Sequence, residues 1–131
     1  MEGESEMSKG ERMETRDLKQ RTQEFALRVI RMVRVLPKSQ EARVIRNQLL
    51  RSATSVGANY RSAQRGKSKA DFIAKLAVAE EEADETCYWL ELIIAAELVS
   101  KDRMEPLLAE AKELTAILTA AGKTAKERRE K

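Results

Sequence analysis

Arg51, Glu82 and Glu85 are the residues whose types and spacing could do chemistry. Two carboxylates three residues apart share one face of a helix, and paired carboxylates inside a helical bundle can hold a di-iron centre. Such a centre also needs Glu-x-x-His motifs on two helices, and the sequence contains no histidine. We therefore predict a structural ion pair of Arg51 with Glu82 and Glu85, which sets the register of two helices.

The absence of histidine removes the usual general base near neutral pH and every Ser-His or Cys-His nucleophile pair. Cys87 is the single cysteine, so neither an intramolecular disulfide nor a structural zinc site can form. Gly66-Lys67-Ser68 resembles the end of a phosphate-binding loop but lacks the first glycine of that motif. We predict that the protein is not an enzyme and uses no metal or cofactor; a carboxylate-only hydrolase or metal protein is the remaining enzyme class.

Charge is segregated along the chain. Residues 16–69 contain 14 Lys or Arg against 3 Asp or Glu, a net +11, whereas residues 76–113 contain 3 against 11, a net −8. A basic face of this kind attracts phosphate, so RNA or DNA is the favoured partner class. The predicted nucleic-acid-binding residues are Arg28, Arg31, Arg34, Arg43, Arg46, Arg61, Arg65, Lys67 and Lys69, with Lys38 on the same basic face.

Within this set, Arg61, Arg65, Lys67 and Lys69 form the predicted ligand-facing cluster, because they lie near the start of a helix whose dipole favours anions. The competing interpretation is that basic and acidic helices pair within the bundle or between subunits, where exposed bridges contribute little each. No aromatic residues are interleaved with the cations for base stacking. The alternative function is therefore a homo-oligomeric protein-interaction scaffold with no nucleic-acid role.

The elements that must position these residues are four helices, because apolar residues recur at three- and four-residue spacings in four segments. Pro37 ends the first segment, Ser39 and Ser68 are N-caps, and Gly122 is the predicted C-cap of the last. Short loops favour an all-α, up-down-up-down antiparallel four-helix bundle. The predicted helices are Asp17–Leu36, Gln40–Ala63, Lys69–Leu98 and Arg103–Ala121.

The predicted domain organisation is a flexible leader over residues 1–15, the bundle over 16–122 and a charged tail over 123–131. No apolar run approaches the roughly 20 residues that span a bilayer, and the N-terminus lacks the apolar core of a secretory signal. We expect a cytoplasmic protein that does not enter a membrane.

The core-facing stripes leave some neighbouring positions open. The first stripe contains Met32 or Val33, the second contains Val44 or Ile45, and the third runs from Phe72 to Ile94. Gly57 in mid-helix would cost about 1 kcal/mol relative to alanine, and a close approach of two helices is the simplest compensation.

Aromatic residues in the third helix exceed what its stripe can hold. Tyr88 and Trp89 are adjacent, so both cannot point inward. We predict an oligomer interface at Tyr88, Trp89 and Leu92, because aromatic residues favour subunit contacts. Binding at a membrane surface is the rival, which the acidic character of this helix disfavours.

Three stretches carry a resemblance to a known family. They are Leu50-Arg-Ser-Ala-Thr-Ser-Val-Gly-Ala-Asn-Tyr-Arg61, Ser68-Lys-Ala-Asp-Phe-Ile-Ala-Lys75 and Glu82-Ala-Asp-Glu-Thr-Cys-Tyr-Trp-Leu-Glu-Leu92. Together they resemble the bacterial four-helix bundle family of proteins encoded in intervening sequences of the large ribosomal RNA gene. The same broad family includes the accessory protein of diversity-generating retroelements.

The resemblance implies a four-helix bundle that assembles into a ring, often a pentamer. For the retroelement member it implies a basic surface that binds nucleic acid and a protein partner, a reverse transcriptase. This sequence departs from the commonest family pattern after Asn59, where Tyr60-Arg61-Ser62-Ala63 replaces an Ile, a small residue and Glu-Gly.

Overall fold

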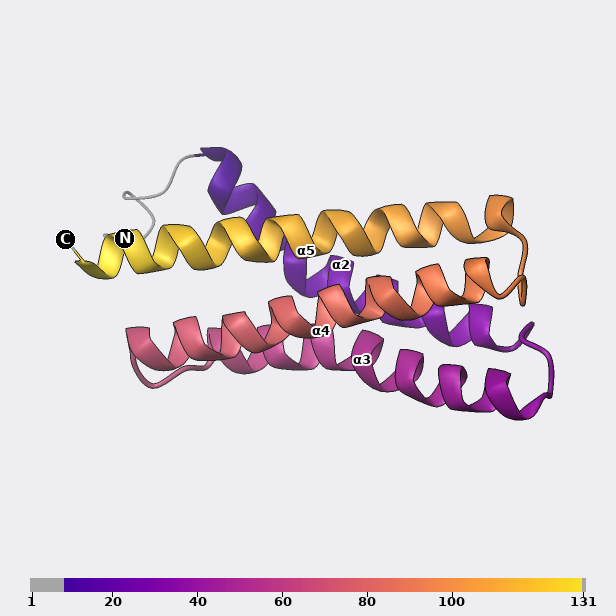
Figure 1. The fold of residues 1–131 in the computed structure, drawn as a ribbon. Helices are drawn as coiled ribbons and strands as arrows, with labels where there is room; N and C mark the ends of the chain where they lie inside the picture. The colour runs from indigo at the N-terminus through magenta and orange to yellow at the C-terminus, as the bar shows by residue number, and fades with distance from the viewer. Residues whose placement is uncertain (1–8, 131) are drawn as a thin grey trace.

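A computed structural model describes residues 9–130 of the chain, with side chains from Leu18 to Arg128. Over these residues the chain forms four α-helices and no β-strand, so the predicted all-α class is confirmed (Figure 1). Residues 1–8 of the predicted leader lie outside the described part. The helices are α2 (Lys9–Val33), α3 (Gln40–Gln64), α4 (Lys69–Ala95) and α5 (Lys101–Glu130).

The four helices pack as an antiparallel bundle. α3 packs against α2 on one side and α4 on the other, and α5 packs against α4 and α2. In Figure 1, α3, α4 and α5 lie along a common direction while α2 crosses them at an incline. The α2–α3 and α4–α5 connections lie at one end of the bundle and the α3–α4 turn at the other. The residues at the start and at the end of α3 therefore lie at opposite ends of the bundle.

The core follows the predicted apolar stripes. Where two neighbours were open, Val33 is buried in preference to Met32, and Ile45 is buried while Val44 is exposed. At the two ends of the α4 stripe, the buried residues are Ile73 and Ile93. The predicted residues, Phe72 and Ile94, are each one position away from them. The fully buried large side chains are Tyr60, Phe25, Leu18, Leu49, Leu76, Leu90, Ile93, Met104, Leu114, Leu118, Val29 and Val56.

Both predicted serine N-caps are present. The Ala42 N–H donates to Ser39 Oγ at 3.3 Å, and the Asp71 N–H donates to Ser68 Oγ at 3.1 Å. The Asp71 carboxylate in turn accepts from the backbone N–H of Lys67 at 3.2 Å. These contacts satisfy amides that the first turn of a helix leaves without a partner, so the start of α3 and of α4 is set locally.

Helix α4 ends at Ala95, three residues before the predicted end. Glu97 adopts a left-handed conformation with φ 57°. The Leu98 N–H then donates to the Ile93 carbonyl at 3.1 Å and the Glu97 N–H to the Ile94 carbonyl at 3.0 Å. This is a Schellman motif with a glutamate at the position that glycine usually occupies. The absence of a glycine is why the sequence pattern did not indicate this end.

The predicted C-cap at Gly122 is wrong, and the predicted charged tail is helical up to Glu130. Gly122 lies inside α5 and has no positive φ. A glycine in a helix interior costs only about 1 kcal/mol, which does not by itself end a helix. Ala125 beyond it is 93% buried, with 7% of its surface exposed, so packing supports the additional turns.

Candidate functional site

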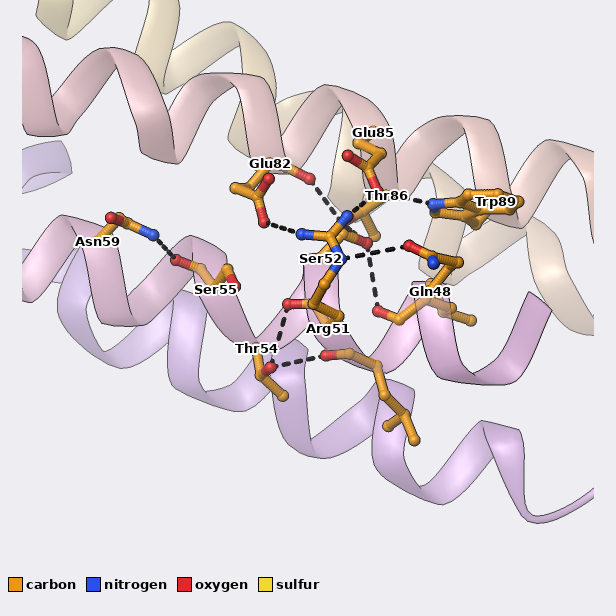
Figure 2. Close-up of polar contacts among 12 residues, drawn as sticks. Gln48, Arg51, Ser52, Thr54, Ser55, Asn59, Glu82, Glu85, Thr86 and Trp89 are labelled. Atoms are coloured by element: carbon orange, nitrogen blue, oxygen red, sulfur yellow. Dashed lines mark hydrogen bonds and ion pairs between the residues drawn. The ribbon is translucent and has the colours of Figure 1, made fainter. Parts of the chain in front are cut away.

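Arg51 on α3 reaches across to α4 and contacts both predicted carboxylates (Figure 2). Its Nη1 lies 2.9 Å from Glu82 Oε2, and its Nη2 donates to Glu85 Oε2. A third contact, from Arg51 Nε to Gln48 Oε1 at 3.2 Å, anchors the guanidinium on its own helix. The three predicted ion-pair residues are therefore brought together, and the planar guanidinium group bridges α3 and α4.

The side chain of Arg51 is more exposed to solvent than the side chains of the two glutamates. The side chain of Arg51 is 47% exposed, against 16% for Glu82. The Trp89 indole N–H donates to Glu85 Oε2 at 3.0 Å, and this bond, followed by the contact with Arg51, lowers the pKa of Glu85. A carboxyl that is held ionised by two donors is suited to fixing helix register, whereas a general acid or base needs a pKa close to the working pH.

A buried pair of hydroxyls lies directly beside this ion pair. Ser52 on α3 and Thr86 on α4 are both fully buried, and their Oγ atoms are 3.0 Å apart. Thr86 Oγ1 also donates to the Glu82 carbonyl at 2.7 Å. The sequence pattern did not predict this contact. Its signal is that each hydroxyl residue directly follows an ion-pair residue, at the inner edge of its helix.

The nine predicted nucleic-acid-binding residues separate into two groups. Arg28 and Arg31 in the last turns of α2, and Arg34 just after its end, join Arg43 and Arg46 in the first turns of α3, at the α2–α3 end of the bundle. The other group lies around the α3–α4 turn at the opposite end. Eighteen residues of helix from Arg43 to Arg61 correspond to roughly 27 Å. Arg61, Arg65, Lys67 and Lys69 form this second group.

Each group contributes to a surface hollow. The first, which we call the α2–α3 hollow, has a volume of about 430 Å³ and the lining residues Val33, Arg34, Leu36, Lys38, Ser39, Arg43 and Arg46. The second, the α3–α4 hollow, has a volume of about 360 Å³ and the lining residues Ala58, Arg61, Ser62, Arg65 and Lys75. No described acidic residue lines either one.

The lining differs from the prediction in detail. Arg28, Arg31, Lys67 and Lys69 line neither hollow. Lys75 lines the α3–α4 hollow and was not among the predicted residues, because it is the α3–α4 turn that brings α4 beside the end of α3. Its Nζ lies 3.3 Å from Asp71 Oδ2, which partly neutralises that hollow.

The predicted interface residues take different orientations. Tyr88 is 57% exposed, while Trp89 and Leu92 are half-buried and pack against the core. The rings of Tyr88 and Trp89 meet edge to face, with centroids 5.0 Å apart. Trp89 therefore packs against the core, and Tyr88 is the member of the pair that faces solvent.

Arg21 and Cys87 also have contacts within the fold. Arg21 on α2 bridges to Glu110 on α5 at 2.8 Å, a contact that the sequence analysis did not predict. Burial raises the pKa of the Cys87 thiol, which favours the unreactive form.

The described residues include no cluster of acidic and cysteine side chains that could hold a metal ion. No helix between residues 9 and 130 is long and apolar enough to cross a bilayer.

Comparisons with known proteins concern the fold and the family of the chain. A crystal structure from Bacteroides thetaiotaomicron, described as a protein of unknown function from the S23 ribosomal protein family, is 40% identical and superimposes with a TM-score of 0.76. The match covers 81% of this chain and 98% of that one. No curated protein matches this chain. Residues 14–120 match the 23S rRNA-intervening sequence protein family. The chain belongs to that family.

Proposed function

We propose that this protein is a non-enzymatic, oligomeric four-helix bundle that binds nucleic acid, RNA or DNA, through the basic surfaces of α2 and α3. The observation that carries the proposal is the α3–α4 hollow, where Arg61, Arg65 and Lys75 surround about 360 Å³ with no described acid in the lining. Cations gathered around a concave surface contact phosphates and orient a nucleic-acid backbone.

The type of binding follows from what lines the hollows. Among the described residues, no aromatic side chain lines either hollow, so bases have no ring on which to stack. Contacts to phosphate then dominate, and these carry little sequence information. We expect weak dependence on sequence and a steep dependence on salt, because each phosphate contact releases counterions.

Charge reversal at Arg61, Arg65 and Lys67 tests the proposal. Lys75 is left unchanged because it pairs with Asp71. Fluorescence anisotropy with a 5′-hydroxyl RNA or DNA oligonucleotide, between about 50 and about 200 mM salt, gives the affinity and the salt slope. We expect the triple variant to lose binding at low salt while circular dichroism shows unchanged helicity.

The matched control reverses three cations on the acidic side of the bundle, Lys101, Arg103 and Lys112 on α5. It changes the net charge by the same amount, so a difference between the two variants reports position and not total charge. We expect this variant to keep most of the affinity. The absence of binding by the natural protein at low salt, or equal losses in both variants, contradicts the proposal.

A second function, a homo-oligomeric scaffold with no nucleic-acid role, is favoured by one observation. Tyr88 is 57% exposed on α4, whose surface is acidic, while α2 and α3 are basic. An exposed tyrosine within a charged surface suits a contact between subunits, as in the ring, often pentameric, that the family resemblance implies. Tyr88→Ala together with light scattering tests this: conversion of an oligomer to a monomer supports a subunit contact at Tyr88, and an unchanged mass excludes it.

A further inference from the structure

The α2–α3 hollow differs from the α3–α4 hollow in its charge balance. Four cations line it, Arg34, Lys38, Arg43 and Arg46. None of the four forms an ion pair with a carboxylate of the described residues, whereas Lys75 in the other hollow pairs with Asp71. The α2–α3 hollow is therefore the stronger concentration of uncompensated positive charge.

The positions of these cations are set by the turn that joins the two helices. Arg34 follows the end of α2, Lys38 lies in the connection, and Arg43 and Arg46 occupy successive turns of α3. Arg46 Nη2 donates to the Pro37 carbonyl at 3.1 Å, which ties its guanidinium to the connection. The hollow is thus assembled from three segments that are adjacent only because the chain reverses here.

The interior side of the hollow is apolar. Val33 and Leu36 line it and are almost completely buried, at 6% and 5% exposed. A low-dielectric wall strengthens the attraction between the cations and a bound anion. The helix dipoles do not set the sign of the electrostatic potential in the hollow, because the carboxyl end of α2 and the amino end of α3 meet here with opposite signs.

The acid nearest in sequence does not compensate the four cations. Glu41 lies in the first turn of α3 and is absent from the lining of the hollow. Its own backbone N–H and the Ser39 hydroxyl bind its carboxylate and lower its pKa. The Glu41 carboxylate is therefore stabilised at the amino terminus of α3, and it does not line the hollow with the four cations.

Charge and size together indicate the ligand class. A single phosphodiester carries one negative charge and would leave most of the four cations uncompensated. A linear di- or triphosphate carries several charges on a compact chain, matches guanidinium groups in bidentate contacts and fits within about 430 Å³. We propose that the α2–α3 hollow is a binding site for an oligophosphate group, supplied by the 5′ end of an RNA or by a free nucleotide.

This site goes beyond the nucleic-acid proposal, because it requires neither a strand nor the α3–α4 hollow. Its test uses inorganic tripolyphosphate as the probe and isothermal titration calorimetry on the full chain at low salt. The test variant is Arg34→Gln/Lys38→Gln/Arg43→Gln; Arg46 is kept because it supports the connection. The matched control is Arg61→Gln/Arg65→Gln/Lys67→Gln, which removes the same charge from the other end of the bundle.

We expect tripolyphosphate to bind the natural protein, and the test variant to bind it roughly tenfold or more weakly, with the control nearly unchanged. Inorganic phosphate should bind roughly tenfold or more weakly than tripolyphosphate. The proposal is overturned by no binding of tripolyphosphate at low salt, by equal losses in the two variants, or by phosphate binding as tightly as tripolyphosphate. Circular dichroism and the melting temperature of each variant report whether it is folded.

Two further arms identify the source of the group. Tighter binding of a 5′-triphosphate RNA than of the same RNA with a 5′-hydroxyl, lost in the test variant, supports the RNA end. Binding of ATP as tight as that of tripolyphosphate, with no gain from the RNA triphosphate, supports a free nucleotide. If neither ligand binds in a way that depends on Arg34, Lys38 and Arg43, the proposal is overturned. Binding of the 5′-hydroxyl oligonucleotide without tripolyphosphate binding would refute this site and leave the proposed function intact.

Discussion

Replacing Gly57 with alanine tests how closely α2 and α3 approach. A Cβ on Gly57 would lie 3.0 Å from Thr22 Oγ1 and 3.3 Å from Thr22 Cβ. The Thr22 hydroxyl cannot turn aside without loss, because the side chain is fully buried and its Oγ1 donates to the Leu18 carbonyl at 2.7 Å. The added methyl group therefore crowds the buried Thr22 side chain, which has little room to shift.

Two opposing effects set the change in the free energy of unfolding that Gly57→Ala causes. Alanine gains about 1 kcal/mol over glycine in a helix interior. Overpacking of a buried contact costs about 1–3 kcal/mol. We expect Gly57→Ala to lower the free energy of unfolding by about 1 kcal/mol, with the steric cost exceeding the gain in helix propensity.

Gly122→Ala is the matched control, because Gly122 also lies inside a helix. A Cβ there would meet only Leu76 Cδ2 at 4.0 Å, which is ordinary contact. We expect Gly122→Ala to raise the free energy of unfolding by about 1 kcal/mol. The free energies of unfolding of the two variants should then differ by about 2 kcal/mol, and the close approach of the helices at Gly57 causes this difference.

Urea denaturation followed by far-UV circular dichroism measures both variants under identical conditions. Thr22→Ala/Gly57→Ala provides a rescue, because removal of Thr22 Oγ1 eliminates the shortest contact. We expect the Gly57 substitution to be less destabilising, or stabilising, in that background. If Gly57→Ala alone stabilises the protein as much as Gly122→Ala, the reasoning about the helix contact is refuted.

Three further predictions concern single groups. Glu97→Gly should raise the free energy of unfolding by about 1 kcal/mol, because a side chain at positive φ is strained, and thermal melts check this. Burial raises the pKa of Tyr60 to about 12. Its folded pKa lies above the unfolded value of about 10, so its contribution to stability is complete below about pH 10 and is lost as the pH rises towards about 12. In a Tyr88→Phe variant the single remaining tyrosine should therefore ionise near pH 12 by absorbance at alkaline pH, and a midpoint near the ordinary value contradicts its burial. Trp89→Phe should raise the pKa of Glu85 towards its ordinary value of 4.5, because the indole N–H no longer stabilises the carboxylate. The contribution of that pKa shift is present above about pH 4.5 and disappears as the pH falls, and an unchanged Glu85 titration by NMR would show that the hydrogen bond is not its cause.

Local signals in the sequence were sufficient for much of the fold. Ser39 and Ser68 offer oxygen atoms to the first free amides of the following helices. Pro37 disfavours helical geometry in the residue before it, and α2 ends at Val33, three residues before the predicted end at Leu36. The contact of Arg51 with Glu82 and Glu85 was also predictable. A charged residue beside an apolar stripe lies at the edge of the interface, where the facing helix can supply its partner.

The ends of helices were less predictable, because a helix stops where the total of local and packing contributions turns unfavourable. Glycine at Gly122 indicated an end, and burial of Ala125 outweighed it. Glu97 carried no such signal, yet it takes the left-handed conformation that closes α4. Residue type gives only the local contribution to either balance.

The sequence by itself determined the four amphipathic helices, their order, the segregation of charge and the lack of histidine chemistry, because each depends on residue types at short spacing. The tertiary structure decided which cations share a hollow, and that Lys75 joins Arg61 and Arg65. It also decided that Trp89 packs inward and Tyr88 faces solvent. Successive residues differ by about 100° around a helix, so periodicity leaves the facing residue uncertain by one position. Only the packing of neighbouring helices and the path of the turns resolves that choice.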